Sequence, residues 1–163
     1  MSGGSSTSTY PVLVTGSREG IPSSIVDFYL SHVFKDFIER RSSGPSELPS
    51  DLPESANTLD NSVQLTTSYV VHGGAVGVDT HASNWAKKND IKEVVYKPDY
   101  SLGRRAPLIR NKEMIDVESP YLVLAFHNGH SKGTLFTANY AKKKGLKVYM
   151  IVYSNGEVSM SEF

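Results

Sequence analysis

Five short segments of the chain carry the glycines, hydroxyls and positive charges that a phosphate site requires. Arginine binds phosphate oxygens bidentately, and glycine lets the backbone approach a ligand closely. A helix N-terminus adds unpaired amide groups and a partial positive charge. The five segments are Thr15-Gly16-Ser17-Arg18, the run from His72 to Asp79, Gly103-Arg104-Arg105, Arg110-Asn111 and Lys132-Gly133-Thr134. Together they predict one site for an anionic ligand, a nucleotide or a nucleotide derivative.

The run from His72 to Asp79 is the most specific of these segments. Its small residues are Gly73, Gly74, Ala75 and Gly77. They lie between an expected strand and an expected helix, so they predict a tight loop that accepts an anion. Asp79 falls in the first helical turn, where it either contacts the ligand or, as the more common arrangement, caps the helix. The sequence contains neither a GxGxxG fingerprint nor a Walker A motif, which argues against a standard dinucleotide or ATP-hydrolase site.

Three arginines, Arg104, Arg105 and Arg110, lie close together before and within an expected helix. Arg110 and Asn111 follow apolar residues, so we expect at least one of them to face inward. A buried arginine needs an anionic partner, because an unpaired charge is costly to remove from water. Ligand binding is therefore favoured over a solvated basic helix start.

The first and last segments are less specific. Gly16, Ser17 and Arg18 offer backbone amides, a hydroxyl and a guanidinium, although an ordinary strand-to-helix turn can have the same composition. Gly133 and Thr134 fall at an expected helix start, with amide and hydroxyl donors of the same kind. Both segments are included in the predicted site.

The elements that must position these residues alternate along the chain. Apolar runs at 10–15, 69–72, 93–96, 121–126 and 147–152 predict strands that are buried on both faces. Helical apolar spacing separates them, with helices expected to begin at Pro22, near Val78, near Arg105 and before Leu135. This order predicts an α/β fold: a Rossmann-like, doubly wound, mostly parallel sheet of five or more strands, with helices on both faces.

The length of 163 residues suits one domain, which we place at 10–163. The polar residues 1–9 predict a flexible leader. Residues 42–67 are rich in Ser and Pro and contain no aromatic residue, so they predict a mobile insertion within the domain.

Composition limits the class of protein. The chain has no cysteine, which excludes disulfides and thiolate chemistry, and its histidines lack metal-ligand spacing. The 17 Lys and Arg residues balance 17 Asp and Glu residues, which argues against general nucleic-acid binding. No apolar run approaches the roughly 20 residues that span a bilayer. We expect a cytoplasmic protein that uses no metal or other cofactor and does not enter a membrane.

Taken together, the motifs resemble the YspA-like branch of the SLOG superfamily. This Rossmann-like group includes the Lonely Guy cytokinin-activating phosphoribohydrolases and the DNA-processing protein A family. The matching motifs are Gly16-Ser17-Arg18, His72 to Asp79, Trp85-Ala86, Arg110 to Met114 and Gly133-Thr134. The resemblance implies a pocket for a nucleotide-derived ligand, in some members a signalling nucleotide, and a homo-oligomer.

The resemblance leaves two functions open. Lonely Guy enzymes cleave an N-glycosidic bond with an Arg and a Glu; Arg110 matches the Arg and is the candidate catalytic residue, but Thr137 stands where the Glu would be. A threonine cannot supply the carboxylate. We therefore expect a binding module that senses or sequesters a nucleotide derivative. The alternative is an N-glycosidic hydrolase of nucleoside monophosphates, and a DNA-binding role is the least favoured.

Overall fold

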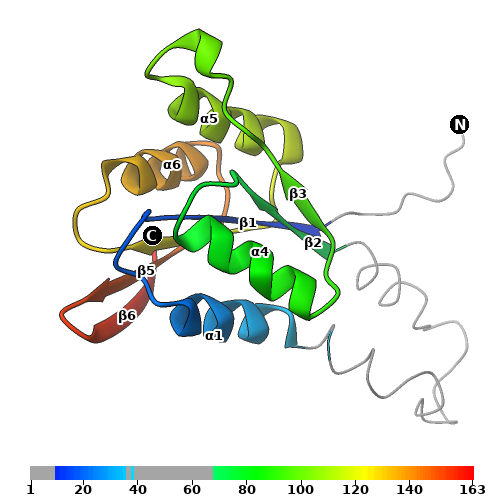
Figure 1. The fold of residues 1–163 in the computed structure, drawn as a ribbon, viewed down its shortest axis with the longest axis vertical. Coiled ribbons are helices and arrows are strands. Elements are labelled where there is room, and N and C mark those ends of the chain that lie inside the picture. Colours follow the sequence, from blue (N-terminus) through cyan, green and yellow to red (C-terminus); the bar gives the residue numbers. More distant parts are fainter. Residues whose placement is uncertain (1–9, 36–37, 39–67) are drawn as a thin grey trace, which may run out of the picture.

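A computed structural model describes residues 10–35, 38 and 68–163 (Figure 1). The expected leader at 1–9 and the expected insertion at 42–67 lie outside the described residues, and both stay predictions. The assignment of residues 10–163 to a single domain also stays a prediction.

The described residues form one six-stranded sheet in the order β3-β2-β1-β4-β5-β6. The strands are β1 (Tyr10–Gly16), β2 (Ser68–His72), β3 (Glu93–Val95), β4 (Leu122–His127), β5 (Val148–Ser154) and β6 (Glu157–Glu162). Strands β1 to β5 pair in parallel, and β6 runs antiparallel to β5. The chain winds outward from β1 to β3, returns to β4 beside β1 and then continues in the opposite direction. This is a doubly wound arrangement, and it confirms the predicted Rossmann-like α/β fold class.

Helices cover both faces of the sheet. As Figure 1 shows, α1 (Ser23–Val33) and α4 (Val78–Lys88) lie on one face, and α5 (Ala106–Glu118) and α6 (Lys132–Lys143) lie on the other. A short 3-10 helix, η3 (Tyr100–Leu102), precedes α5. Within the described ranges, no helix combines the length and the apolar character that crossing a membrane requires.

The strands read as continuous apolar runs because each face of the sheet has its own core. Along β1, Val12 and Val14 belong to the core beneath α1 and α4, whereas Leu13 belongs to the core beneath α5 and α6. Trp85 of α4 fills the first core, and Met114 of α5 fills the second. Alternate residues of a strand point to opposite faces, so burial on both faces needs apolar residues throughout.

The strand β6 was not expected, because its sequence has no apolar run and every one of its residues is exposed. It follows Asn155 and Gly156, which both have positive φ, at 54° and 78°. Two such residues form the tight hairpin turn that joins antiparallel strands, and an Asn-Gly pair is the usual signal for it. That signal was present in the sequence.

Three details of the helices differ from the sequence expectations. Pro22 is the residue before the first turn of α1, with extended backbone at φ −66° and ψ 149°, rather than its first helical residue. Leu135 and Phe28 are exposed, although the three- to four-residue spacing of the apolar residues around each of them predicts a buried helix face. Tyr29 does pack against the core, and Phe37, from the same stripe, lies outside the described residues.

The order of the strands determines where a ligand can bind. The connection after β1 crosses to β2 on one side, and the connection after β4 crosses to β5 on the other. The chain therefore leaves β1 and β4 toward opposite faces of the sheet, and this divergence opens a crevice at the carboxyl ends of these neighbouring strands.

Candidate functional site

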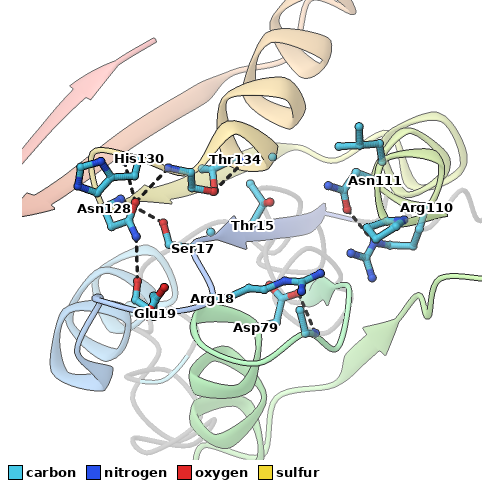
Figure 2. A pocket seen from close by; sticks show the side chains of 16 residues that line it. Thr15, Ser17, Arg18, Glu19, Asp79, Arg110, Asn111, Asn128, His130 and Thr134 are labelled. Atoms are coloured by element: carbon cyan, nitrogen blue, oxygen red, sulfur yellow. Dashed lines mark hydrogen bonds between the residues drawn. The ribbon is translucent and has the colours of Figure 1, made fainter. Parts of the chain in front are cut away.

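A cavity of about 420 Å³ occupies this crevice, between the ends of β1 and β4 and the first turns of α5 and α6 (Figure 2). The expected site residues that line it are Gly16, Ser17, Arg18, Ala75, Asp79, Arg110, Asn111, Gly133 and Thr134. In Figure 2, Arg110 and Asn111 enter from α5 on the side opposite Ser17 and Asn128. Most of the separate motifs therefore meet at one place.

The structure does not bring the remaining expected residues into the cavity lining. They are Gly73, Gly74, Gly77, Arg104 and Arg105. Arg104 and Arg105 are exposed, and Arg105 stands at the N-cap of α5. At about 100° per residue, Arg110 points roughly 140° away from Arg105 around the helix axis, which explains why only Arg110 faces inward.

Arg110 is the central charged group of the cavity, and only 7% of it is exposed. Its Nη1 donates to the carbonyl oxygens of Gly73 (2.6 Å) and Tyr96 (3.1 Å), and its Nε donates to Asn111 Oδ1 (2.7 Å). Its Nη2 donates to no described residue. Every buried side-chain nitrogen and oxygen of the described residues has a hydrogen-bond partner, so the unbonded Nη2 must be accessible to solvent. Because Arg110 lines the cavity, we infer that Nη2 faces it.

The charge on Arg110 is only partly balanced by protein groups. Burial lowers the pKa of its guanidinium, and the nearby positive charge of Arg18 lowers it further, while Asp79 and Tyr100 oppose the change. Arginine nevertheless stays charged in proteins. Two guanidinium groups therefore repel each other at the cavity, and an anion between them would be stabilised.

The glycine loop after β2 is closed by the protein's own carboxylate. Asp79 Oδ2 accepts hydrogen bonds from the backbone amides of Gly73 (3.1 Å) and Ala75 (3.2 Å). The amide of Gly74 donates to His72 Nδ1 (3.0 Å). The predicted anion-accepting loop thus holds the protein's own Asp79, and the amides of Gly73, Gly74 and Ala75 already have acceptors within the protein.

The glycines of this loop are needed for close packing. A Cβ on Gly73 would lie 2.4 Å from the Arg110 guanidinium, and a Cβ on Gly77 would lie 2.5 Å from the carbonyl oxygens of Ser17 and Arg18. Gly77 also has φ +86°, which favours glycine. These residues shape the site by letting Arg110 and the start of α4 approach the strands.

Asp79 is 7% exposed and lies in the first turn of α4. Burial raises the pKa of its carboxyl group, and the amide of Ala75 and the charge of Arg110 act in the opposite direction. Its hydrogen bonds go to the preceding loop, so it orders that loop rather than capping α4. Its second oxygen, Oδ1, accepts no hydrogen bond from a described residue and must therefore be accessible to solvent. Because Asp79 lines the cavity, we infer that Oδ1 faces it.

Two buried histidines end β2 and β4, the strands on either side of β1, and hold the loops that follow in the same way. His72, the last residue of β2, accepts at Nδ1 from Gly74 and contacts Glu93 Oε1 through Nε2 (2.7 Å). His127, the last residue of β4, accepts at Nδ1 from Gly129 (3.0 Å). Both rings are occupied in holding loops, and the part of the chain that is described has no cluster of three metal-binding side chains.

The loops after β1 and β4 are tied together across the crevice. Ser17 Oγ donates to the Phe126 carbonyl (3.4 Å) and accepts from the Asn128 amide (3.1 Å). Asn128 Nδ2 donates to the Glu19 carbonyl (3.1 Å). Ser17 Oγ thus links the loop after β1 to the end of β4 at the wall of the cavity.

The first turn of α6 faces the cavity with free donors. Ser131 caps the helix by accepting from the Thr134 amide (3.3 Å), and its carbonyl accepts from the Leu135 amide (3.4 Å). The amides of Lys132 and Gly133 donate to no described residue, as expected for the first turn of a helix. This end of α6 therefore presents amide donors and a partial positive charge to an anion.

Thr137, where the resemblance to Lonely Guy enzymes leads us to expect a catalytic Glu, is fully buried and absent from the cavity lining. It donates to the Gly133 carbonyl (3.0 Å) and accepts from Asn111 Nδ2 (2.7 Å). Because Asn111 also binds Arg110, a chain of hydrogen bonds joins the guanidinium to the first turn of α6. Thr137 thus positions the cavity walls without reaching a ligand.

Sequence reasoning missed several residues of the lining. They are Glu19, Pro107, Leu108, Asn128, His130 and Ser131, and Thr15 of the first segment lines the cavity as well. Each lies within four residues of a motif that was recognised, so a broader window around each motif would have included them. Glu19 and His130 add a second carboxylate and an imidazole to the exposed rim.

Comparison with known proteins indicates the family of the chain. The profile of the YspA, cpYpsA-related SLOG family matches residues 56–103, which include the glycine loop and Asp79. The chain is 34% identical over 85 residues to the Gene 61 protein of Mycobacterium phage D29, and the match covers 48% of this chain and 67% of the phage protein. No solved structure gives a significant match. The fold, the recurring strand-end motifs and these similarities agree, and the chain belongs to the YspA, cpYpsA-related SLOG family.

Proposed function

We propose that the protein binds a nucleotide or a nucleotide-derived, phosphate-bearing ligand in the cavity at the ends of β1 and β4. Membership of the SLOG family supports a nucleotide-related role in binding or processing in general. The observation that carries the proposal is the buried Arg110 guanidinium, whose Nη2 is open to the cavity. A buried arginine with unused donors is suited to a phosphate oxygen.

The groups around Arg110 support the same ligand. Arg18 adds a second guanidinium to the cavity, and the amides of Lys132 and Gly133 lie at the positive end of α6. Gly133 leaves the approach to these amides unobstructed, because a Cβ at this position would have no neighbour within 4 Å. A phosphate group could therefore be held by a guanidinium on one side and by helix amides on the other.

We favour binding over catalysis because Thr137 supplies no carboxylate and is buried outside the cavity lining. The protein would then act as a sensor or a sequestering module for its ligand. A homo-oligomer and a cytoplasmic location accompany this proposal as predictions, and the exposed Phe28 on α1 is a candidate contact between copies.

A nucleotide N-glycosidase is the second candidate, because one observation favours it. Asp79 places a carboxylate in the same cavity as Arg110, and burial raises the pKa of that carboxyl group, so it is suited to exchange a proton. Base release from nucleoside monophosphates, followed by chromatography, tests this activity. Activity that is the same in wild type and in Asp79→Asn would assign the release to another enzyme in the preparation.

The binding proposal is tested by calorimetry of the purified protein against nucleoside monophosphates, cyclic ADP-ribose isomers and inorganic phosphate. Gly133→Asp places a negative charge at the start of α6, where it favours the helix but repels an anionic ligand. Gly133→Ala is the matched control, since it adds a side chain in the same open space. We expect saturable binding by wild type and Gly133→Ala and none by Gly133→Asp. Absence of binding by wild type, or equal binding by the two variants, would overturn the proposal.

A further inference from the structure

We propose that Asp79 binds a neutral hydrogen-bond donor of the ligand, so that the cavity selects a phosphate ester with a sugar hydroxyl or a base amino group over inorganic phosphate. This inference rests on the proposed function and specifies the class of ligand. It follows from an acceptor atom that the fold leaves open at the cavity.

The open acceptor is Oδ1 of Asp79. The other oxygen, Oδ2, receives both loop amides, from Gly73 and Ala75. No arginine or lysine nitrogen of a described residue lies within 4.0 Å of the carboxylate, so Asp79 has no direct ion pair there. Asp79 is only 7% exposed, and its unbonded oxygen is accessible to solvent at a residue that lines the cavity.

The chemistry of that oxygen determines what it can bind. A carboxylate accepts hydrogen bonds and repels phosphate oxygens, so it does not share the role of Arg110. Inorganic phosphate can offer only its own P–O–H groups as donors, on the same small ion that binds the guanidinium, so we expect it to satisfy Arg110 and to leave the Asp79 oxygen unpaired. A nucleoside monophosphate has both parts: phosphate oxygens for Arg110 and neutral O–H or N–H donors for Asp79. The cavity thus pairs one anion-binding wall with one donor-binding wall.

Asp79→Asn is a conservative test of this wall. The amide oxygen of the asparagine can accept from Gly73 and Ala75 in place of Oδ2, while the amino group replaces the open acceptor with a donor. Asp116→Asn is the matched control, because Asp116 is an exposed carboxylate that bonds Tyr140 and lies outside the cavity lining.

The experiment measures the affinity of wild type, Asp79→Asn and Asp116→Asn for four probes by calorimetry. The probes are adenosine 5′-monophosphate, its 2′,3′-dideoxy analogue, inosine 5′-monophosphate and inorganic phosphate. A hydrogen bond to a charged group corresponds to an affinity change of roughly 10- to 150-fold. The dideoxy analogue lacks the sugar hydroxyls, and inosine 5′-monophosphate lacks the base amino group. We expect the affinity of wild type for one of these two probes to be about tenfold or more below its affinity for adenosine 5′-monophosphate. Asp79→Asn should bind adenosine 5′-monophosphate more weakly than wild type does, and its affinity should fall little further with the probe to which wild type is sensitive. Asp116→Asn should match wild type for all four probes.

The outcomes distinguish this inference from the proposed function. If adenosine 5′-monophosphate binds wild type and neither removal weakens it, the Asp79 inference is overturned and the phosphate site stands. The same holds if Asp79→Asn shows the full wild-type sensitivity to the analogues. If no phosphate ester binds wild type, both proposals fail. The comparison of probes on wild type alone decides the question even if Asp79→Asn does not fold.

Discussion

Replacing Arg18 with alanine separates ligand binding from folding more cleanly than any other change in the cavity. The Arg18 side chain is exposed and forms no hydrogen bond or ion pair with a described residue. It acts on Arg110 only through repulsion, as its lowering of the Arg110 pKa indicates. We therefore expect Arg18→Ala to change the free energy of unfolding by no more than about 0.5 kcal/mol.

The expected loss of binding is much larger. A net hydrogen bond between a charged group and its partner contributes about 1.5–3 kcal/mol, which corresponds to roughly 10- to 150-fold in affinity. Because Arg18 is exposed and its charge is screened by water and salt, the lower part of this range applies. We expect Arg18→Ala to weaken binding of a nucleoside 5′-monophosphate by about 10- to 30-fold.

Isothermal titration calorimetry at constant ionic strength measures this loss, and urea denaturation verifies that stability is unchanged. Arg104→Ala is the matched control, because it removes an exposed arginine that lies outside the cavity lining. It should bind the nucleotide as wild type does. Equal affinity of Arg18→Ala and Arg104→Ala would refute the placement of the anion beside Arg18.

Three further predictions concern stability. Gly77→Ala should lower the free energy of unfolding in urea by about 3 kcal/mol or more, because its Cβ would meet backbone oxygens at 2.5 Å and the residue has φ +86°. Gly145→Ala, with φ +81° but no neighbour within 4 Å, should lower it by only about 1–2 kcal/mol. Similar losses in the two variants would contradict the packing argument. Burial raises the pKa of Asp79 above its ordinary value of 3.8, so its folded form binds the proton more tightly and its contribution to stability is lost as pH rises from about 3.8 through the folded pKa. Asp79→Asn has no such titration, so the free energy of unfolding of the variant minus that of wild type should rise across that pH window. A difference that stays constant with pH would argue against a raised pKa of Asp79. Thr137→Val should lower the free energy of unfolding by about 1–3 kcal/mol, because it leaves the side-chain amide of Asn111 without its acceptor. Thr137→Ser keeps the hydroxyl and should lose much less stability. Equal losses in thermal or urea unfolding would show that the hydroxyl is unimportant.

The sequence predicted the parallel part of the fold well, for a physical reason. Strands that are buried on both faces must be apolar throughout, as Val12, Leu13 and Val14 are in β1. Strand β6 lacks this signature because all its residues are exposed, so only the Asn155-Gly156 turn could have indicated it. Burial produces a strong pattern, and an exposed edge strand produces a weak one.

The location of the site was also predictable, because parallel strands bring their carboxyl ends to one edge of the sheet. Ser17, Arg110 and Thr134 accordingly line one cavity, although their contact with a ligand stays a prediction. The internal bonding of the glycine loop was not predictable. That Asp79 would occupy the loop amides, and that Gly73 would make room for a guanidinium from α5, depends on distances between segments that no local pattern contains.

The central claim is that a nucleotide phosphate binds between Arg110 and the first turn of α6. Amide NMR of the isotope-labelled protein during titration with adenosine 5′-monophosphate tests it most directly, because each backbone amide reports on its own surroundings. We predict saturable shifts that are largest at Lys132 and Gly133 and extend to Arg18. Saturable shifts that leave these amides unchanged, or no saturable shift at all, would contradict the account.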